Sequence, residues 1–245
     1  MICYLDIEHD VALAHPEDRM AHQAHNLDVQ RRLETISGEA CQVVDYGDLT
    51  FGWLEASGAR ALIIGGNVTD WSEYDPVDLE QLCDVIRAAP VPILGVCGGC
   101  QLIAIAYDVP LGPIRRLHPG EADPDAGYAG GFFKEWGFVP VRVIKSDPLF
   151  DGLGSEPVFL EVHYWEVRQV PPGFELLAST DVCRVQAVRQ IDEPVYGVQF
   201  HPEAYIAPGE PSKSWLVDLV YPEGYDKLHP AGRRLLENFL SLEVA

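Results

Sequence analysis

The 245-residue sequence has few basic residues, with 17 Lys and Arg against 38 Asp and Glu, and its formal net charge is −21. A surface this negative repels phosphate groups, so nucleic acids and anionic membranes are poor candidate partners. The sequence also lacks an apolar run of 18 residues and a basic-then-apolar amino terminus. We therefore expect neither a membrane span nor a secretory signal.

Cysteine is sparse as well, at six residues without the spacing of a disulfide framework, which favours a reducing, cytoplasmic location. No G-x-x-x-x-G-K-[ST] phosphate-binding motif is present, so neither a nucleotide site nor a cofactor is expected. What the sequence does have is a 47% share of hydrophobic residues, enough for a sizeable core. Because no repeat or linker divides the chain, we expect a single domain over residues 1–245.

Short apolar runs alternate with segments of helical spacing over the first hundred residues. The runs, which are continuous and therefore typical of strands buried in a parallel sheet, lie at 2–7, 41–46, 61–64 and 93–96. Between the first two runs, Pro16 and the acids after it favour a helix start, and Gly38 favours its end. The sequence therefore predicts an α/β fold with helices on both faces of a mostly parallel sheet.

From about Gly137 the pattern changes to short strands joined by Pro and Gly turns. The candidate strands lie at 138–144, 158–163, 184–188 and 195–200. Their spacing predicts a small antiparallel extension in the C-terminal half. A last helix is expected after Pro230. Residues 205–229 before it are predicted to form a long loop, acting as a lid, a partner contact or plain surface cover.

Cys97 follows the fourth apolar run directly and precedes an apolar helical segment. A nucleophile on a sharp strand-to-helix turn needs small residues two places before and two places after it, and Gly95 and Gly99 occupy those places. Such a turn presents the sulfur at a helix N-terminus, where the thiolate is favoured. We therefore predict that Cys97 is a nucleophile rather than a buried structural cysteine.

A candidate base lies further along the chain, in the segment YGVQFHPE at 196–203. His201 ends a predicted strand, so it shares the strand-end edge of the sheet with Cys97 and with the turn at Gly65-Gly66. Imidazole can remove a thiol proton near neutral pH. Glu203 can face the same side, where its carboxylate would orient the ring and stabilise the imidazolium.

These two segments carry a family resemblance. The segment GVCGGCQ at 95–101 resembles the G-[IV]-C-x-G-x-Q nucleophile motif of class I (triad) glutamine amidotransferases, and YGVQFHPE resembles their His-x-Glu motif. The Gly65-Gly66 turn, the Glu135-Trp136-Gly137 segment and the closing helix are similar as well, so the resemblance covers most of residues 40–205 and that helix. It implies a flavodoxin-like, mostly parallel sheet flanked by helices.

The resemblance also implies an activity. Cys97 would attack the side-chain amide of glutamine to give a γ-glutamyl thioester and ammonia, with His201 moving protons and Glu203 orienting it. Backbone N–H groups of Gly66 and Gly98 would form the oxyanion hole. The residues implied in substrate binding are Gln101, His163, Tyr164 and Trp165.

Two segments depart from the family pattern. The oxyanion turn, usually S-G-G-P, reads Ile64-Gly65-Gly66-Asn67 here. The strand that often carries H-x-D reads His163-Tyr164-Trp165-Glu166, so its acid is one methylene longer.

Three functions are compatible with these residues. The first is an amidotransferase subunit that passes ammonia to a separate synthetase, since no synthetase motif is present in this sequence. The second is a stand-alone γ-glutamyl hydrolase or peptidase with water as the acceptor. The third, a non-catalytic regulatory member of the fold, is disfavoured by the intact set of Cys97, His201 and Glu203.

Two weaker patterns have simpler interpretations. Cys97 and Cys100 could form a redox pair, but Cys100 is more simply a packing residue behind the nucleophile. His22 and His25, three residues apart on a predicted helix, could present two imidazoles to a metal ion. Because no acid or cysteine in the sequence pattern completes the set, we expect no metal.

Overall fold

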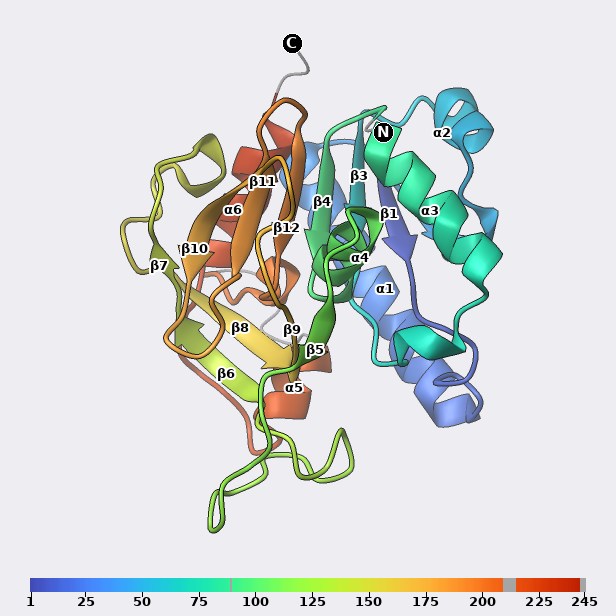
Figure 1. The fold of residues 1–245 in the computed structure, drawn as a ribbon. Helices are drawn as coiled ribbons and strands as arrows, with labels where there is room; N and C mark the ends of the chain where they lie inside the picture. The colour runs from blue at the N-terminus through green and yellow to red at the C-terminus, as the bar shows by residue number, and fades with distance from the viewer. Residues whose placement is uncertain (89, 209–214, 243–245) are drawn as a thin grey trace.

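The computed structural model describes residues 1–88, 90–208 and 215–242, and an eight-stranded sheet lies at its centre (Figure 1). The strand order is β2 (Cys41–Asp45), β1 (Ile2–Asp6), β3 (Ala61–Ile64), β4 (Ile93–Val96), β12 (Val195–Val198), β11 (Ala187–Gln190), β10 (Phe174–Ser179) and β7 (Arg142–Val143). From β2 to β12 every pairing is parallel, and from β12 to β7 every pairing is antiparallel. The parallel part has the 2-1-3-4-5 order of flavodoxin-like sheets. The predicted α/β fold with an antiparallel C-terminal extension is confirmed.

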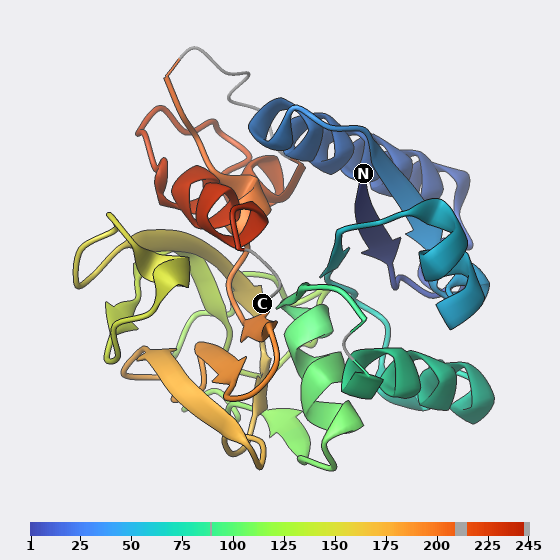
Figure 2. The ribbon, with the colours of Figure 1, turned by 90° about the horizontal axis from the view of Figure 1, so that it is seen from above.

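Helices cover both faces of this sheet, as the view from above shows (Figure 2). On one face lie α1 (Pro16–Ser37) and α6 (Ala231–Leu240), and on the other lie α3 (Pro76–Ala88) and α4 (Gly98–Ala106). Side chains of β1 alternate between the two cores, because successive residues of a strand point to opposite faces: Tyr4 packs with α1, and Leu5 packs with α3 and α4. Burial of both faces explains why the strands read as unbroken apolar runs.

The helix ends follow the sequence signals. α1 begins with Pro16 at its first turn and ends at Gly38, whose φ of 69° lies in the left-handed region that glycine adopts without strain. α2 (Phe51–Ser57), which the sequence pattern did not single out, begins after Thr50, whose side chain accepts a hydrogen bond from Trp53 N. Within the described ranges, no helix combines the length and the apolar character that crossing a membrane requires.

A separate two-stranded ribbon of β6 (Glu135–Pro140) and β8 (Val158–His163) lies beside the main sheet (Figure 1). The shorter pair of β5 (Leu111–Pro113) and β9 (Trp165–Val167) connects α4 to this ribbon. A small apolar cluster lies on the ribbon, in which Leu216 and Val217 of α5 (Trp215–Val220) pack with Leu160 and Val162 of β8. The ribbon therefore carries its own core, distinct from the two cores of the main sheet.

Three sequence expectations differ in detail from the structure. The strand expected at 138–144 is divided: β6 pairs with β8, whereas β7 joins the main sheet, because the fully buried Val141 turns the chain into the core between them. The strand expected at 184–188 lies at 187–190. The loop expected at 205–229 contains α5, which is stabilised by its contacts with β8; residues 209–214 of that segment lie outside the described residues.

Candidate functional site

Cys97 lies on a sharp turn between β4 and α4. Its φ of 50° and ψ of −104° are unfavourable for a residue with a side chain, and such strain concentrates at functional sites. A Cβ on Gly95 would lie 2.4 Å from Gly99 O, and a Cβ on Gly99 would lie 2.4 Å from Ile64 O. Both flanking positions therefore exclude any larger residue, as the interpretation of this segment as a nucleophile turn requires.

His201 follows β12, the parallel neighbour of β4, so it lies at the same edge of the sheet as Cys97. The ring Nδ1 of His201 lies 2.7 Å from Glu203 Oε1, and both side chains are buried. Helix α6 supports this turn from behind, since a Cβ on Gly232 would lie only 2.1 Å from Pro202 O. The geometry leaves Nε2 of His201 as the nitrogen that can exchange a proton with Cys97.

The charges of this pair stabilise each other. Burial alone would lower the pKa of His201, but the charges of Glu203 and Cys97 and the hydrogen bonds to them raise it well above its ordinary value. Burial alone would raise the pKa of Glu203, but the imidazolium of His201 holds it below its ordinary value. The site therefore favours an imidazolium next to a carboxylate.

The glycine turn after β3 lies against the sulfur. A Cβ on Gly66 would lie 3.4 Å from Cys97 Cβ and 3.3 Å from His201 Cε1. A Cβ on Gly98 would lie 2.0 Å from Asn67 Oδ1, so the turn and the start of α4 are in close contact. Asn67, which stands where the family usually has proline, donates from Nδ2 to Thr69 O and Tyr74 Oη at 2.8 Å each. These hydrogen bonds stabilise the conformation of the turn, whose sequence differs from the family pattern.

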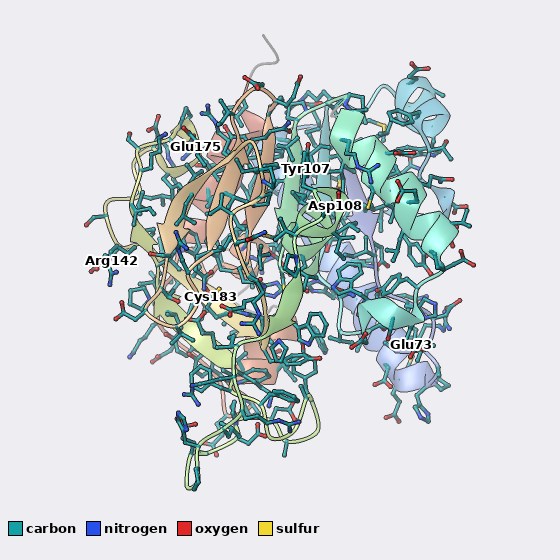
Figure 3. All side chains as sticks on the ribbon, viewed as in Figure 1. Glu73, Tyr107, Asp108, Arg142, Glu175 and Cys183 are labelled. Carbon is teal, nitrogen blue, oxygen red and sulfur yellow. The ribbon has the colours of Figure 1, made fainter. Side chains whose placement is uncertain are left out.

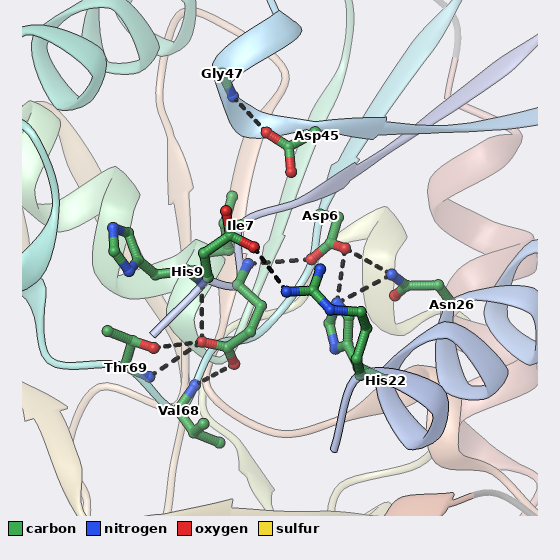
Figure 4. Close-up of polar contacts among 12 residues, drawn as sticks. Asp6, Ile7, His9, His22, Asn26, Asp45, Gly47, Val68 and Thr69 are labelled. Atoms are coloured by element: carbon green, nitrogen blue, oxygen red, sulfur yellow. Dashed lines mark hydrogen bonds and ion pairs between the residues drawn. The ribbon is translucent and has the colours of Figure 1, made fainter. Parts of the chain in front are cut away.

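Glu8 stabilises the same turn. The sequence analysis did not single out this residue. Its carboxylate accepts hydrogen bonds from Val68 N at 2.7 Å and from Thr69 Oγ1 at 2.6 Å (Figure 4). The side chain is 6% exposed although it is an acid. Its place just after β1, at the edge where the parallel strands end, was a signal that could have singled it out.

Two glutamine side chains extend from the sulfur to the cleft wall. Gln199, which sequence reasoning did not single out, is fully buried and donates from Nε2 to Cys97 Sγ at 3.6 Å. Gln101 accepts from Trp71 Nε1 at 3.1 Å and donates from Nε2 to Trp165 O at 3.4 Å. The amide of Gln101 therefore connects Trp71 and the backbone of Trp165 in the cleft wall.

The three residues expected at the substrate end occupy different environments. Tyr164 and Trp165 are partly exposed and line the cleft. His163 is 1% exposed; its Nδ1 lies 2.8 Å from Trp165 O and its Nε2 lies 3.1 Å from Glu135 Oε2. Burial lowers the pKa of His163, but the neighbouring carboxylates of Glu135 and Glu161 raise it to about 10. His163 therefore supports the cleft wall from the interior.

Two cavities meet at Cys97. The smaller, about 20 Å³, lies on the side of Gln101, Tyr164 and Trp165. The larger, about 440 Å³, lies on the side of His201 and Gly66, and we call it the chamber. Its apolar wall is formed by Leu13, Trp136, Val162, Trp215, Leu216 and Leu219. Asn67, Val68 and Tyr128 line both cavities, as Cys97 does.

The residues of the two weaker sequence patterns, His22, His25 and Cys100, each contact other side chains or strands of the structure. His22 Nε2 lies 2.7 Å from Asp6 Oδ2, which also accepts from Asn26 Nδ2 at 2.6 Å (Figure 4). The ring of His25 lies 5.9 Å from that of Trp215, and burial lowers its pKa to about 4. His22 and His25 thus have separate partners. Cys100 is 1% exposed and packs against β12, where burial raises the pKa of its thiol.

Residues 38–215 match the family model "Glutamine amidotransferase class-I". Curated relatives include the A subunit of the glutamine-hydrolyzing GMP synthase of Archaeoglobus fulgidus, 33% identical over 145 residues that make up 59% of this chain and 66% of that protein. The corresponding protein of Methanocaldococcus jannaschii is 40% identical over 120 residues, which make up 49% of this chain and 55% of that protein. The chain thus spans about half to two thirds of the length of these relatives.

Solved structures share the fold over nearly the whole chain. A protein from Thermoplasma acidophilum assigned as the A subunit of a GMP synthase has a TM-score of 0.64 at 23% identity, over 98% of this chain and 92% of that one. A glutamine amidotransferase from Thermotoga maritima has a TM-score of 0.62 at 14% identity, over 98% of this chain and 99% of that one. Since the family model covers well over half of the sequence, the chain belongs to the class I glutamine amidotransferase family.

Proposed function

We propose that this protein is a glutaminase that hydrolyses the side-chain amide of glutamine through a thioester on Cys97 and supplies the ammonia to a separate synthetase. The observation that carries the proposal is the position of Cys97, on a strained turn at the same sheet edge as the His201–Glu203 pair, whose Nδ1–Oε1 distance is 2.7 Å. A nucleophile, a base and a residue that orients the base are the three parts of a hydrolytic triad.

In the first half-reaction, the thiolate of Cys97 attacks the amide carbon of glutamine. The carbonyl oxygen becomes an oxyanion, for which the N–H groups of Gly66 and Gly98 are the proposed donors. His201, which is protonated beside Glu203, gives its Nε2 proton to the amide nitrogen. The carbon–nitrogen bond breaks, ammonia leaves and the γ-glutamyl group remains on sulfur as a thioester.

In the second half-reaction, neutral His201 takes a proton from water as the water oxygen attacks the thioester carbon. The carbon–sulfur bond breaks, glutamate leaves and the thiolate–imidazolium pair is restored. Glu203 stabilises the imidazolium at both stages without exchanging the proton. Gln199, whose amide donates to the sulfur, is proposed to hold the thiolate in the orientation for attack.

Glutamine is proposed to enter the cleft between Gln101, Tyr164 and Trp165. A cavity of about 20 Å³ holds little more than one water molecule, so entry requires this wall to open. The hydrogen bonds from Trp71 to Gln101 and from Gln101 to Trp165 O are the contacts that must rearrange. His163 keeps the backbone of Trp165 in place from behind and is a positioning residue in this scheme.

The proposed acceptor of the ammonia is a synthetase of the GMP synthase type. The support is that the curated relatives are named as A subunits of glutamine-hydrolyzing GMP synthases. A cytoplasmic location is proposed as well, since all six cysteines are free thiols and are buried. The acceptor and the location are proposals that go beyond family membership. Reconstitution with the synthetase tests the proposed acceptor.

The chamber favours one other function, a stand-alone γ-glutamyl hydrolase. Ammonia needs about the space of one water molecule, whereas the chamber on the His201 side of Cys97 has about 440 Å³, within the range of small-molecule sites. A substituted amine leaving from a γ-glutamyl amide would enter that space. Its apolar wall would suit an alkyl or aryl amine.

Initial rates on a matched substrate panel test both functions. The full chain is assayed with glutamine, γ-glutamyl alkylamides and γ-glutamyl peptides by glutamate release, with Cys97→Ala as the blank. Preference for glutamine, with a rate that rises when a synthetase of the GMP synthase type is added together with its substrates, supports the proposed glutaminase. A kcat/KM at least tenfold higher for the substituted amides supports the hydrolase. No Cys97-dependent release from any of these substrates contradicts both functions.

A further inference from the structure

A second cluster of side chains that can bind metal ions lies in the interior, outside the proposed triad. Glu135 and His163 face each other across the β6–β8 ribbon, and Glu161 lies two residues before His163 on the same face of β8. The segment joining β10 to β11 supplies Cys183 (Figure 3). The four side chains are between 0% and 5% exposed, and ligand-type atoms of Glu135, His163 and Cys183 all lie within 4.8 Å of one another.

The hydrogen bonds of this cluster are unevenly distributed. Glu135 accepts from Thr180 Oγ1 at 2.6 Å and from Gln186 Nε2 at 2.7 Å. Glu161 is 0% exposed, and neither of its carboxylate oxygens receives a hydrogen bond of good geometry from the described residues. Burying an ionised carboxylate without donors is strongly unfavourable. Glu161 therefore has the His163 ring beside it but no hydrogen bond of good geometry.

The carboxylate of Glu161 lies against a ring nitrogen of His163 that Glu135 also contacts. Glu161 Oε2 lies 3.2 Å from His163 Nε2, and Glu135 Oε2 lies 3.1 Å from the same atom. A carbonyl oxygen cannot donate, so the 2.8 Å contact of Nδ1 with Trp165 O places a hydrogen on Nδ1. Nε2 carries at most one further hydrogen, which cannot satisfy two carboxylates. A divalent cation at this position would satisfy both acids together.

The distances from the two carboxylates to His163 Nε2 fit such a cation. Zinc lies about 2.0–2.2 Å from nitrogen and oxygen ligands, so two ligands of a tetrahedral ion are about 3.3 Å apart. The two oxygen–nitrogen distances, 3.1 and 3.2 Å, need to widen by only a few tenths of an ångström. The surroundings also match, because ligating histidines usually donate their other N–H to a carbonyl, and ligating carboxylates are held by further hydrogen bonds.

We propose that Glu135, Glu161, His163 and Cys183 form a buried, structural site for a divalent transition metal, with Zn²⁺ as the best match. One thiolate, one imidazole and two carboxylates favour zinc over magnesium or calcium, which take oxygen ligands. Four protein ligands leave no open position, so the ion would be structural. It would join the β6–β8 ribbon to the β10–β11 segment and so hold the wall of the cleft that ends at Trp165.

Metal content and cobalt spectroscopy test the site. The full chain, carrying Cys97→Ala so that the triad thiol cannot contribute, is purified without chelator and its zinc content is measured by mass spectrometry. It is then unfolded with chelator and refolded with Co²⁺. We expect about one zinc per chain, and with cobalt a near-ultraviolet charge-transfer band that only a coordinated thiolate produces.

Matched variants assign the ligands. In the same background, Cys183→Ser is expected to abolish the charge-transfer band, whereas Cys83→Ser, at another buried cysteine far from the cluster, should keep it. Glu161→Gln should fold and bind the metal at least tenfold more weakly. The proposal is overturned if the parent protein holds no stoichiometric metal and shows no thiolate band with cobalt, or if the band persists in Cys183→Ser. None of these readouts depends on glutaminase activity.

Discussion

His201 Nδ1 and Glu203 Oε1 lie 2.7 Å apart, although only Pro202 separates the two residues in the chain. The proline begins a single turn of 3-10 helix, which brings the carboxylate back beneath the ring that precedes it. Both groups are buried, so their attraction is weakly screened by water. Nε2 of the ring is thereby left for Cys97, and the raised pKa of His201 follows from the same contact.

Replacing Glu203 with Gln should lower kcat about 10- to 100-fold, whereas His201→Asn should remove nearly all activity. The amide can still accept a hydrogen bond from the ring but no longer stabilises the imidazolium, so the pKa of His201 falls. The pH–rate profile of Glu203→Gln should therefore move to lower pH. Equal losses in the two variants, or a shift to higher pH, would contradict the orienting role of Glu203.

Cys97→Ser should lower glutamine hydrolysis by more than about 10³-fold, because a hydroxyl in the same place ionises far less readily than a thiol. Cys100→Ala should keep most of the activity, since Cys100 is buried against β12. Steady-state rates and thermal unfolding of both variants separate chemistry from folding. An equally inactive but folded Cys100→Ala protein would reopen the interpretation of the two cysteines as a redox pair.

Gly95→Ala should destabilise the fold by about 1–3 kcal/mol, because its Cβ would lie 2.4 Å from the rigid backbone oxygen of Gly99. Gly52→Ala is the matched control in α2, where a Cβ would meet nothing closer than 3.9 Å, and it should stabilise by up to about 1 kcal/mol. Urea unfolding measures both free energies. A Gly95→Ala protein as stable as the parent would show that the turn has room to relax.

The contact between His22 and Asp6 should make stability depend on pH. Burial lowers the pKa of His22, but the hydrogen bond to Asp6 raises it above its ordinary 6.5, so the stabilisation is complete below pH 6.5 and lost as the pH rises through the folded value. Burial raises the pKa of Asp6, but His22 lowers it below its ordinary 3.8, so this contribution is lost as the pH falls through that lower value.

His22→Gln should therefore lower the free energy of unfolding by about 1–2 kcal/mol near pH 5.5 and by clearly less at pH 9. The control is His15→Gln, at an exposed histidine whose side chain makes no cap hydrogen bond at the start of α1. Urea unfolding across this pH range gives the two differences. A His22→Gln effect that is constant with pH would show that the pair is neutral in the folded protein.

The sequence by itself determined the parallel part of the fold and the residues proposed for the triad, because these features are local. A strand buried on both faces must be apolar throughout, and β3 and β4 lie where the apolar runs predict them. A nucleophile turn requires small residues at fixed positions, so Gly95 and Gly99 single out Cys97. The base and its orienting acid lie within three residues of each other.

Only the tertiary structure decided which distant residues complete these features. Helix α5 forms because Leu216 and Val217 pack on β8, and β10 exists because its neighbours β11 and β7 provide hydrogen bonds. Glu8 contacts the glycine turn from the end of β1, and Gln199 contacts the sulfur from the end of β12. The second cluster likewise combines Glu135 of β6, Glu161 and His163 of β8, and Cys183 of the segment between β10 and β11. No periodicity marks such residues, because the side chains that explain their burial belong to other strands, and folding alone brings them together.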